Sequence, residues 1–536
     1  MAKSLRPILE IVKKLELPEK YFEQIGPYGG KVRLDLLDDG AFPRRGKLIL
    51  VTATTPTASG EGKTVTSIGL TQGLARIGKK VIVTSREPSL GPVFGMKGGA
   101  AGGGASTIEP AAKINLHFHG DFHAIAAAHN LLAALVDAHI FHGNDLNLDP
   151  ERITWPRTMD MNDRALRDIV VNAGSKKGMA RRTGFVITAA SEIMAIIALA
   201  KSREDLRLRL ENIVVGVTRT GKPVFAKDLQ ATGAMMALLT EAIQPNLVQT
   251  VEGVPAFVHA GPFGNIAHGT SSVISQEMGL RLTDYVVNEC GFAADLGAEK
   301  YIDIVYRSTG VSPAAAVLVT TVQSLRNQGE GDLEKGIPNL VQHLQILRKF
   351  GLPTVVAINR FPKDSDADLE RLERACQENG ALSARHTAFA NGGAGAEELA
   401  RRVVEMIEKN PGVKAKHIYE PDETLEAKIQ KVAREVYGAR GVTLSEKAKA
   451  KLRDFTSWGF GKLPVCIAKT QYSFSDNPKL MGAPKDWELH VSDASLSAGV
   501  GFVVVIAGNM MLMPGLPKVS RAVEVDVDAA GEIVGV

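Results

Sequence analysis

Cysteine is scarce in this chain, and the three that occur lie far apart. Cys290, Cys376 and Cys466 show none of the paired spacings typical of a structural zinc site or a disulfide framework, which indicates a reducing compartment. An excess of one charge is also missing, since 63 Lys and Arg are balanced by 59 Asp and Glu. Aromatic residues make up only 5% of the chain and do not alternate with basic clusters. We therefore expect no nucleic-acid partner.

Long apolar runs are absent as well. Residues 1–20 are charged throughout and lack the apolar core of a signal peptide. Apolar stretches such as 189–200 and 500–508 are too short to cross a bilayer. From these absences we predict a cytoplasmic protein with no membrane partner. Its 536 residues are enough for two to four domains with a large buried core.

Glycine, by contrast, is placed where a phosphate would need it. The apolar run 48–51 predicts a buried parallel strand, and the pattern from Lys63 to about Ile77 predicts a helix. Backbone N–H groups in a glycine-rich turn of this kind, with the helix N-terminus, bind phosphate; Lys63 would reach the terminal phosphates and Thr64 would bind Mg²⁺. The predicted nucleotide-binding residues are Thr57, Ala58, Ser59, Gly60, Glu61, Gly62, Lys63 and Thr64.

One position of this loop departs from the usual spacing, because Thr57 stands where the first glycine is expected. The alternative interpretation is a glycine-rich surface turn without a ligand. The strand before the loop and the helix after it favour a nucleotide site.

Strand-like runs alternate with helical stretches along the chain, which predicts an α/β fold of P-loop NTPase type, with a mainly parallel sheet flanked by helices and smaller additional α/β domains. Ligands are expected at the carboxyl ends of such strands. The runs are 48–52, 81–84, 213–217, 316–320 and 354–358. The expected domains are 1–345 for the nucleotide and phosphoryl chemistry, 346–480 as a second α/β domain with adenine contacts, and 481–536 as a β-rich domain.

Two further segments are placed near the loop by this pattern. Arg86 and Glu87 follow the second strand, and a guanidinium there could hold a carboxylate and a phosphate together; ordinary surface ion pairs are the alternative. Residues 95–104 contain six glycines, which suits a backbone that approaches a ligand or another chain closely; a flexible loop is the alternative.

The remaining candidate site residues are a group of histidines and a turn that could bind a purine. Half of the twelve histidines fall within residues 117–142, but without the partners and spacing of a zinc site, so we interpret them as polar residues that position a small substrate. Residues 359–364 resemble the base-reading corner of guanine-nucleotide enzymes, with Phe361 and Pro362 as a stacking platform for a purine; a buried turn without a ligand is the alternative.

These blocks together resemble the formate–tetrahydrofolate ligase family (formyltetrahydrofolate synthetase). The similarity runs from about residue 5 to the C-terminus, and its blocks are long and occur in order. They are residues 55–64, 86–92, 95–104, 120–125, 160–167, 245–250, 261–269, 293–300, 468–473 and 513–517.

The resemblance implies ATP-dependent ligation of formate to tetrahydrofolate through formyl phosphate, with 10-formyltetrahydrofolate, ADP and phosphate as products. It also implies Mg²⁺, a monovalent cation (K⁺ or NH₄⁺) and a homotetramer. The roles it implies are Lys63, Arg86 and Asp121 as catalytic residues, Thr64 as the Mg²⁺ ligand, Glu87 near the monovalent cation, and Phe361, Pro362 and Phe389 as further nucleotide contacts.

The departures from the family pattern fall on other segments. Ala105 follows the glycine run where Tyr is usual, Phe389 replaces a Trp, and residues 323–326 (Gln-Ser-Leu-Arg) replace a family block. From these changes we expect a raised KM for monoglutamyl tetrahydrofolate, or a preference for another reduced pterin. The alternatives are a ligase that uses a different pterin or amine acceptor, and a nucleotide-binding paralogue that does not catalyse.

Overall fold

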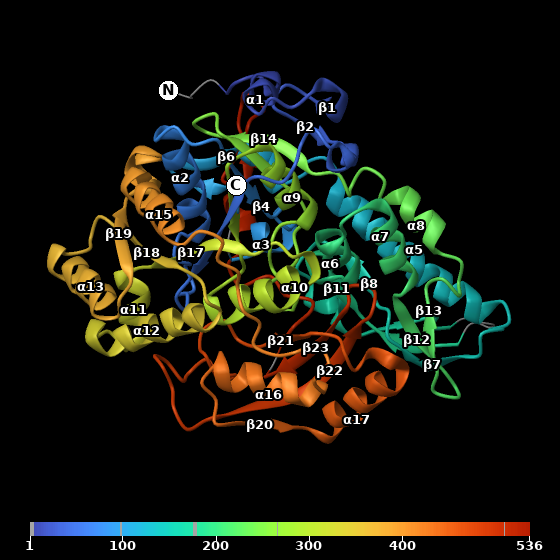
Figure 1. Cartoon of the computed structure of the whole chain (residues 1–536). Coiled ribbons are helices and arrows are strands. Elements are labelled where there is room, and N and C mark those ends of the chain that lie inside the picture. Colours follow the sequence, from blue (N-terminus) through green and yellow to red (C-terminus); the bar gives the residue numbers. More distant parts are fainter. Residues whose placement is uncertain (1–4, 97–98, 175–178, 265, 509) are drawn as a thin grey trace.

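The computed structural model describes residues 5–96, 99–174, 179–264, 266–508 and 510–536, and in this part of the chain twelve strands join one large sheet (Figure 1). Its parallel part runs in the order β15-β4-β16-β3-β17-β18-β19. The bounds are Pro255–Val258 (β15), Val81–Ser85 (β4), Tyr285–Glu289 (β16), Lys47–Ala53 (β3), Pro313–Thr320 (β17), Thr354–Asn359 (β18) and Leu382–His386 (β19).

The sheet continues beyond β15 with antiparallel strands. They are β14 (Asn246–Thr250), β2 (Gly29–Val32), β1 (Phe22–Ile25), β6 (Ser106–Glu109) and β5 (Gly102–Gly103). The mixed α/β fold with a mainly parallel sheet is therefore confirmed.

Strand β3 shows why this sheet is buried on both faces. Leu48 and Leu50 point into one apolar core, whereas Ile49 and Val51 point into the other. Because successive side chains of a strand face opposite sides, an uninterrupted apolar run is what a strand covered on both faces requires. The helices α2 (Lys63–Arg76) and α15 (Glu397–Lys409) pack together over one face, and α9 (Val273–Leu282) and α12 (Leu333–Lys349) contribute to the core on the other (Figure 1).

Two smaller parts are attached to the main sheet (Figure 1). Residues 121–243 contain α5 (Asp121–Phe141), α6 (Glu192–Leu199), α7 (Arg203–Glu211) and α8 (Thr232–Leu238) with the short strands β7 (Leu148–Ile153), β8 (Arg157–Met159), β9 (Ile169–Val171), β10 (Arg181–Thr183), β11 (Phe185–Ile187), β12 (Val214–Thr218) and β13 (Pro223–Phe225). The C-terminal part holds a separate sheet, β20-β22-β23-β21, with α16 (Leu425–Glu435) and α17 (Glu446–Phe455).

The strands of that sheet are β20 (Gly441–Leu444), β21 (Val465–Ala468), β22 (Glu488–Ser497) and β23 (Phe502–Ala507). The remaining elements are α1 (Ile8–Lys14), α3 (Leu90–Phe94), α4 (Ala111–Asn115), α10 (Arg307–Thr309), α11 (Val322–Gln328), α13 (Asp366–Glu378), α14 (Ala388–Asn391), β24 (Asp526–Val527) and β25 (Ile533–Val534).

One predicted strand does not belong to the large sheet. The run at 213–217 forms β12, which pairs antiparallel with β13 and β7 in a small sheet of its own. The prediction that this run joins the large sheet is therefore wrong. A strand's sequence does not specify which other strand it pairs with. The divisions at 345/346 and 480/481 stay predictions, although β18 pairs with β17 and β21 pairs with β23 across them.

Helix α5 bears on the expectation that no segment crosses a membrane. Its 21 residues reach a mean hydropathy of 1.5 over one window, so length and composition alone would allow it to span a bilayer. A single helix of this kind is weak evidence, because core helices pass the same test. Asp121 in the first turn of α5 forms a buried ion pair with Lys31, and the apolar side chains of this helix pack against α8 and α6.

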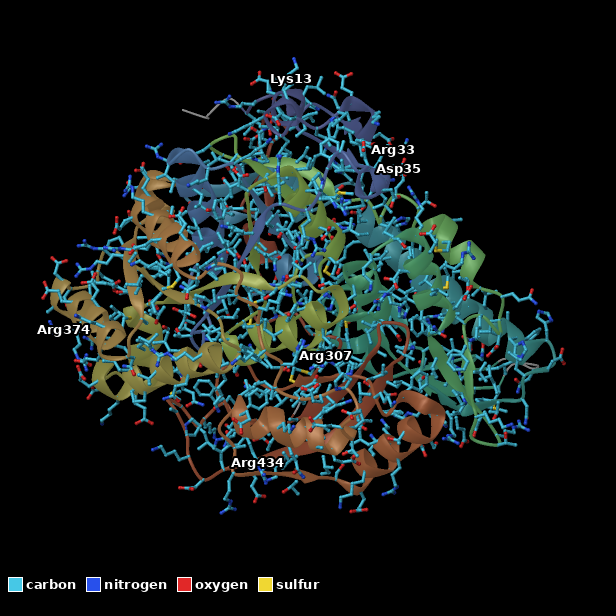
Figure 2. The ribbon with its side chains drawn as sticks, in the orientation of Figure 1. Lys13, Arg33, Asp35, Arg307, Arg374 and Arg434 are labelled. Atoms are coloured by element: carbon cyan, nitrogen blue, oxygen red, sulfur yellow. The ribbon has the colours of Figure 1, made fainter. Side chains whose placement is uncertain are left out.

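Charged side chains follow the outer faces of the helices. Lys13 on α1, Arg374 on α13 and Arg434 on α16 all lie on the periphery (Figure 2). Arg307 differs, since it is half-buried and donates to the carbonyl of Tyr419 while it pairs with Asp303. This contact ties α10 to the segment that leads into the C-terminal part.

Candidate functional site

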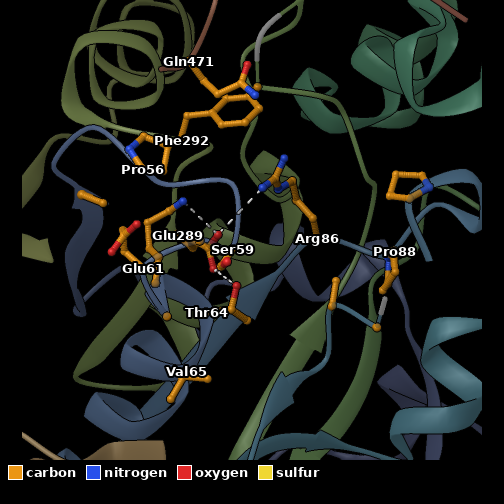
Figure 3. A pocket seen from close by; sticks show the side chains of 18 of the residues that line it. Pro56, Ser59, Glu61, Thr64, Val65, Arg86, Pro88, Glu289, Phe292 and Gln471 are labelled. Atoms are coloured by element: carbon orange, nitrogen blue, oxygen red, sulfur yellow. Dashed lines mark hydrogen bonds and ion pairs between the residues drawn. The ribbon is translucent and has the colours of Figure 1, made fainter. Parts of the chain in front are cut away.

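A cavity of about 460 Å³ lies at the carboxyl ends of β3, β4 and β16 (Figure 3). Its walls come from segments far apart in the chain. They are Ala53 at the end of β3, residues 56–65 after it, Ser85 at the end of β4, residues 86–89 after it, Pro92, Val93, Met96, Gly99, Ala100, Gly102, Gly261, Phe263, Gly264, Glu289, Phe292, Gln471 and Tyr472. The structure thus brings the predicted phosphate loop and the segment of Arg86 and Glu87 to one site, as expected for the ends of parallel strands.

Two glycines shape the phosphate loop. Gly60 and Gly62 have φ of +77° and +71°, where side chains with a Cβ are strained. Thr57 is not among the residues with positive φ, so its position does not demand glycine. The departure from the usual spacing at Thr57 is therefore compatible with this backbone.

The side chain of Glu61 holds the loop in shape. Its Oε1 accepts from the backbone N–H of Thr57 at 2.6 Å, and its Oε2 accepts from the hydroxyl of Thr321. The amide of Asn359 donates to the Glu61 carbonyl at 3.1 Å. The loop is consequently braced by residues that follow β17 and end β18.

Helix α2 starts directly at the loop. Gly62 is its N-cap, with no side chain capping it and no acidic residue in the first turn. The first backbone N–H groups of a helix lack intrahelical acceptors and carry a partial positive charge, so this end suits an anion. The helix therefore adds to the positive charge of Lys63 at the cavity.

Glu289 joins three predicted site residues. At the end of β16, its Oε2 accepts from the Thr64 hydroxyl at 2.7 Å, and its Oε1 lies 3.4 Å from the Lys63 ammonium and 3.8 Å from the Arg86 guanidinium. Figure 3 shows Thr64 and Arg86 both turned toward it. Burial raises the pKa of Glu289, but the charges of Lys63 and Arg86 outweigh this and hold that pKa below its usual value. Glu289 is thus a carboxylate between two cations.

Arg86 is oriented by backbone on its other side. Its Nη1 donates to the carbonyl of Pro262 at 3.1 Å. The neighbouring carbonyl of Gly264 accepts from the buried ammonium of Lys300 at 2.9 Å. A Cβ on Gly264 would lie 3.0 Å from the Cα of Gly291, so the glycine allows the two segments to pack closely. Residues 261–264 therefore form a fixed wall behind the guanidinium; Asn265, from the same sequence block, lies outside the described residues.

Glu87 lines the cavity but faces a buried polar cluster. Burial raises the pKa of Glu87 well above its usual value, and the negative charge of Asp121 adds to this shift. One of its carboxylate oxygens, Oε2, is buried and has no hydrogen-bond partner among the described residues. Oε2 of Glu87 is thus a buried carboxylate oxygen that a cation could contact.

Asp121 lies behind Glu87 and is not among the residues that line the cavity. Its Oδ1 is 2.5 Å from the ammonium of Lys31, and its Oδ2 accepts from Asn246 at 2.8 Å. Both charged side chains are buried, with exposed fractions of 2% for Lys31 and 3% for Asp121. The catalytic role for Asp121 stays a prediction, and in this structure its visible contacts are those of a buried ion pair.

We expect Asp121→Ala to destabilise the fold, because it strands the buried ammonium of Lys31. Breaking one partner of a buried pair costs about 3–5 kcal/mol. The midpoint of chemical denaturation measures this effect. The double variant Lys31→Met/Asp121→Ala should recover part of the loss, and a double variant as unstable as the sum of the two single ones would contradict the pairing.

The predicted aromatic contacts lie outside the cavity lining. Phe361, Pro362 and Phe389 are absent from it, and Phe389 is 60% exposed. Phe389 packs on the glycine run, since a Cβ on Gly103 would lie 3.1 Å from its ring. Their contact with a purine stays a prediction. Gly103 and Gly104 allow this close approach, while Lys97 and Gly98 of the same run lie outside the described residues.

Other predicted features are not brought to the cavity. Ala105 donates its backbone N–H to Phe389, and Arg326 pairs with Asp368 at 3.0 Å. The histidines of residues 117–142 lie on or near α5, where His119 contacts Asn246 and His129 stacks on Trp155. Among the described residues, none of these histidines lines the cavity.

Sequence reasoning missed Glu289, Phe292 and Tyr472 as cavity residues. For Glu289 a signal was available, because the run Tyr285-Val286-Val287 before it reads as a short buried strand. Its closeness to Lys63 depends on β16 lying next to β3 in the sheet. No local pattern specifies that neighbour.

Comparisons with known proteins agree along the whole chain. The family model described as formate–tetrahydrofolate ligase matches residues 1–536. A formate–tetrahydrofolate ligase from Kosmotoga olearia is 50% identical over 100% of this chain and 98% of its own, and one from Methylobacterium nodulans is 51% identical over the same shares. A solved structure of translation elongation factor SelB from Methanococcus maripaludis, in complex with a GTP analogue, aligns with 26% of this chain and 28% of its own at 15% identity and a TM-score of 0.16, too low to inform the fold.

Proposed function

The chain belongs to the formate–tetrahydrofolate ligase family, and we propose that it joins formate to N10 of tetrahydrofolate with cleavage of ATP to ADP and phosphate. The observation that carries the proposal is the meeting of Lys63, Thr64 and Arg86 in one cavity beside the phosphate loop. The alternatives of another acceptor or a non-catalytic paralogue are not favoured, because full-length relatives at 50–51% identity are named for this activity.

The chemistry proceeds in two steps in this proposal. An oxygen of formate attacks the γ-phosphorus of ATP, the bond to the β-phosphate oxygen breaks, and ADP leaves as formyl phosphate forms. N10 of tetrahydrofolate then attacks the formyl carbon, the C–O bond to phosphate breaks, and N10 loses its proton. Phosphoryl transfer depends on positioning and charge neutralisation, which Lys63, Arg86 and the start of α2 supply.

The donor set at the loop fits Mg²⁺. Mg²⁺ prefers oxygen ligands, and Thr64 and Glu289 offer a hydroxyl and a carboxylate oxygen within 2.7 Å of each other. Bound there, Mg²⁺ would neutralise phosphate charge. The order strand β3, glycine loop and helix α2, with a carboxylate at the end of the neighbouring β16, supports a P-loop NTPase-like arrangement.

Glu87 fits a monovalent cation such as K⁺ or NH₄⁺. Its buried Oε2 has no hydrogen-bond partner in the described part of the chain, and a cation would stabilise its charged form. Its position beside Arg86 at the end of β4 would put that cation next to the phosphoryl site.

The adenine would lie between the loop and the segments that carry Phe361, Pro362 and Phe389. The exposed ring of Phe389 packs on the glycine run beside the cavity, which supports a stacking role.

For assembly we propose a homotetramer, supported by apolar side chains exposed near the C-terminus, such as Val519 and Val523. The buried free thiols Cys290, Cys376 and Cys466 support a cytoplasmic location.

The proposal predicts ADP release that requires both formate and tetrahydrofolate for sustained turnover. A coupled assay for ADP, run with each substrate omitted in turn, checks this, and 10-formyltetrahydrofolate is quantified in the same mixtures. ADP release that is indifferent to formate, or that rises with formate without any formylated folate, would contradict it.

A further inference from the structure

Glu289 contacts two cations in addition to the hydroxyl of Thr64. Its Oε2 is used by the Thr64 hydroxyl, while its Oε1 is shared by the ammonium of Lys63 and the guanidinium of Arg86. Lys63 begins α2 and Arg86 follows β4, and the two cations meet at this one oxygen. Lys63 and Glu289 are only 13% and 12% exposed, so water screens their attraction poorly.

Lys63 and Arg86 are also the two cations that the proposed function assigns to phosphate. A phosphate group and the Oε1 of Glu289 therefore compete for the same donors. Two cations held together in a largely buried cavity repel each other and lose hydration, so a fixed carboxylate between them lowers the free energy of the arrangement. The same carboxylate repels an incoming polyanion.

We infer that Glu289 is a charge placeholder that holds Lys63 and Arg86 in position, and that it yields Lys63 to the bound nucleotide and Arg86 to the transferring phosphoryl group only when Mg²⁺ compensates its own charge. The inference rests on the proposed function and adds a selection step to it. Nucleotide that arrives without Mg²⁺ meets an uncompensated carboxylate, whereas nucleotide with Mg²⁺ does not. Glu289 thereby favours the Mg²⁺-bound form of ATP over free ATP and over inorganic phosphate.

The Thr64 contact separates this role from simple bracing. A hydroxyl that coordinates a metal through its lone pair still has its hydrogen to donate, so Thr64 can keep its bond to Oε2 throughout. Only the contacts of Oε1 need to exchange. The negative charge of Glu289, and not its hydrogen-bonding capacity, is then the property that excludes Mg²⁺-free anions.

Glu289→Gln tests this because it keeps the size of the side chain and an oxygen for Thr64 but removes the charge. In the presence of a chelator, we expect the variant to bind ATP at least about tenfold more tightly than the wild type, and to bind inorganic phosphate more tightly as well. Calorimetric titration with Mg²⁺-free ATP, with ATP plus Mg²⁺ and with phosphate gives the three affinities. Turnover of the variant with Mg²⁺ should fall at least about tenfold.

Three further variants make the result specific. Glu289→Asp keeps the charge and should retain the wild-type preference for Mg²⁺-bound ATP. Glu446→Gln makes the same charge change on the exposed face of α17 and should leave every affinity unchanged. Glu289→Ala removes the charge in a second way, so the result does not depend on the folding of one variant.

The outcomes separate this inference from the proposed function. Mg²⁺-free ATP that binds Glu289→Gln and Glu289→Ala no more tightly than the wild type would overturn the placeholder and leave the ligase activity standing. A wild type that binds ATP under neither condition would overturn the proposed function itself. Tighter Mg²⁺-free binding in both charge-removing variants, with Glu289→Asp like the wild type, supports the placeholder.

Discussion

Replacing Lys63 by Ala should reduce turnover about a thousandfold or more. Its ammonium lies at the start of α2, 3.4 Å from Glu289, where it would neutralise charge on the terminal phosphates as the bond to ADP breaks. Loss of such a group removes several kcal/mol of transition-state stabilisation, and about 4 kcal/mol corresponds to a thousandfold change in rate. Formate-dependent ADP release, measured with the folded variant, checks the result.

Lys47→Ala is the matched control, because Lys47 begins β3, the strand before the phosphate loop, and is exposed. It should keep wild-type activity. If the Lys63→Ala enzyme retains more than about a tenth of wild-type activity, Lys63 has no part in phosphoryl transfer. A variant that has lost its structure by circular dichroism would leave Lys63→Arg, which keeps the charge at a different length, to decide.

The strand, the glycine-rich turn and the helix around the predicted phosphate loop could be predicted because these parts are contiguous. The strand, the turn and the helix occupy residues 47–76 without interruption, and each has its own local signal. Positive φ at Gly60 and Gly62 is also a local demand that only glycine meets easily. The departure at Thr57 did not mislead, since that position needs no special backbone conformation.

Glu289 could not be predicted in the same way, because it reaches the loop from 225 residues further along the chain. The order of strands in the sheet brings β16 next to β3, and a short apolar run does not tell which strand it will pair with. The run that became β12 shows the same limit from the other side. Its sequence reads as a strand, yet its partners are β7 and β13 outside the large sheet.

The residues that depart from the family pattern lie in different places in the structure. Arg326 contacts Asp368 and the carbonyl of Gly331, away from the cavity. Ala105 follows the glycine run and donates its backbone N–H to the carbonyl of Phe389. Residues 323–326 do not line the cavity, and the expected weakening of folate binding stays a prediction.

Replacing Arg86 by Gln should lower kcat on the order of a hundredfold to a thousandfold while the affinity for ATP changes little. The guanidinium is held between the carbonyl of Pro262 at 3.1 Å and Glu289 at 3.8 Å, with part of it open to the cavity. In the proposed reaction, an arginine in this place would stabilise charge that develops on the transferring phosphoryl group, and such contacts act mainly in the transition state. Loss of a transition-state contact lowers kcat and kcat/KM together.

Steady-state kinetics with separate titration of ATP and formate, together with direct measurement of ATP binding, distinguishes this role from a nucleotide contact. Arg86→Lys keeps the positive charge but not the two-pronged geometry, so it should recover only part of the activity. A large loss of ATP affinity with unchanged kcat would make Arg86 a contact of the bound nucleotide. We expect the loss of kcat with little change in ATP affinity, because the carbonyl of Pro262 orients the guanidinium while Lys63 and the start of α2 remain to bind the nucleotide.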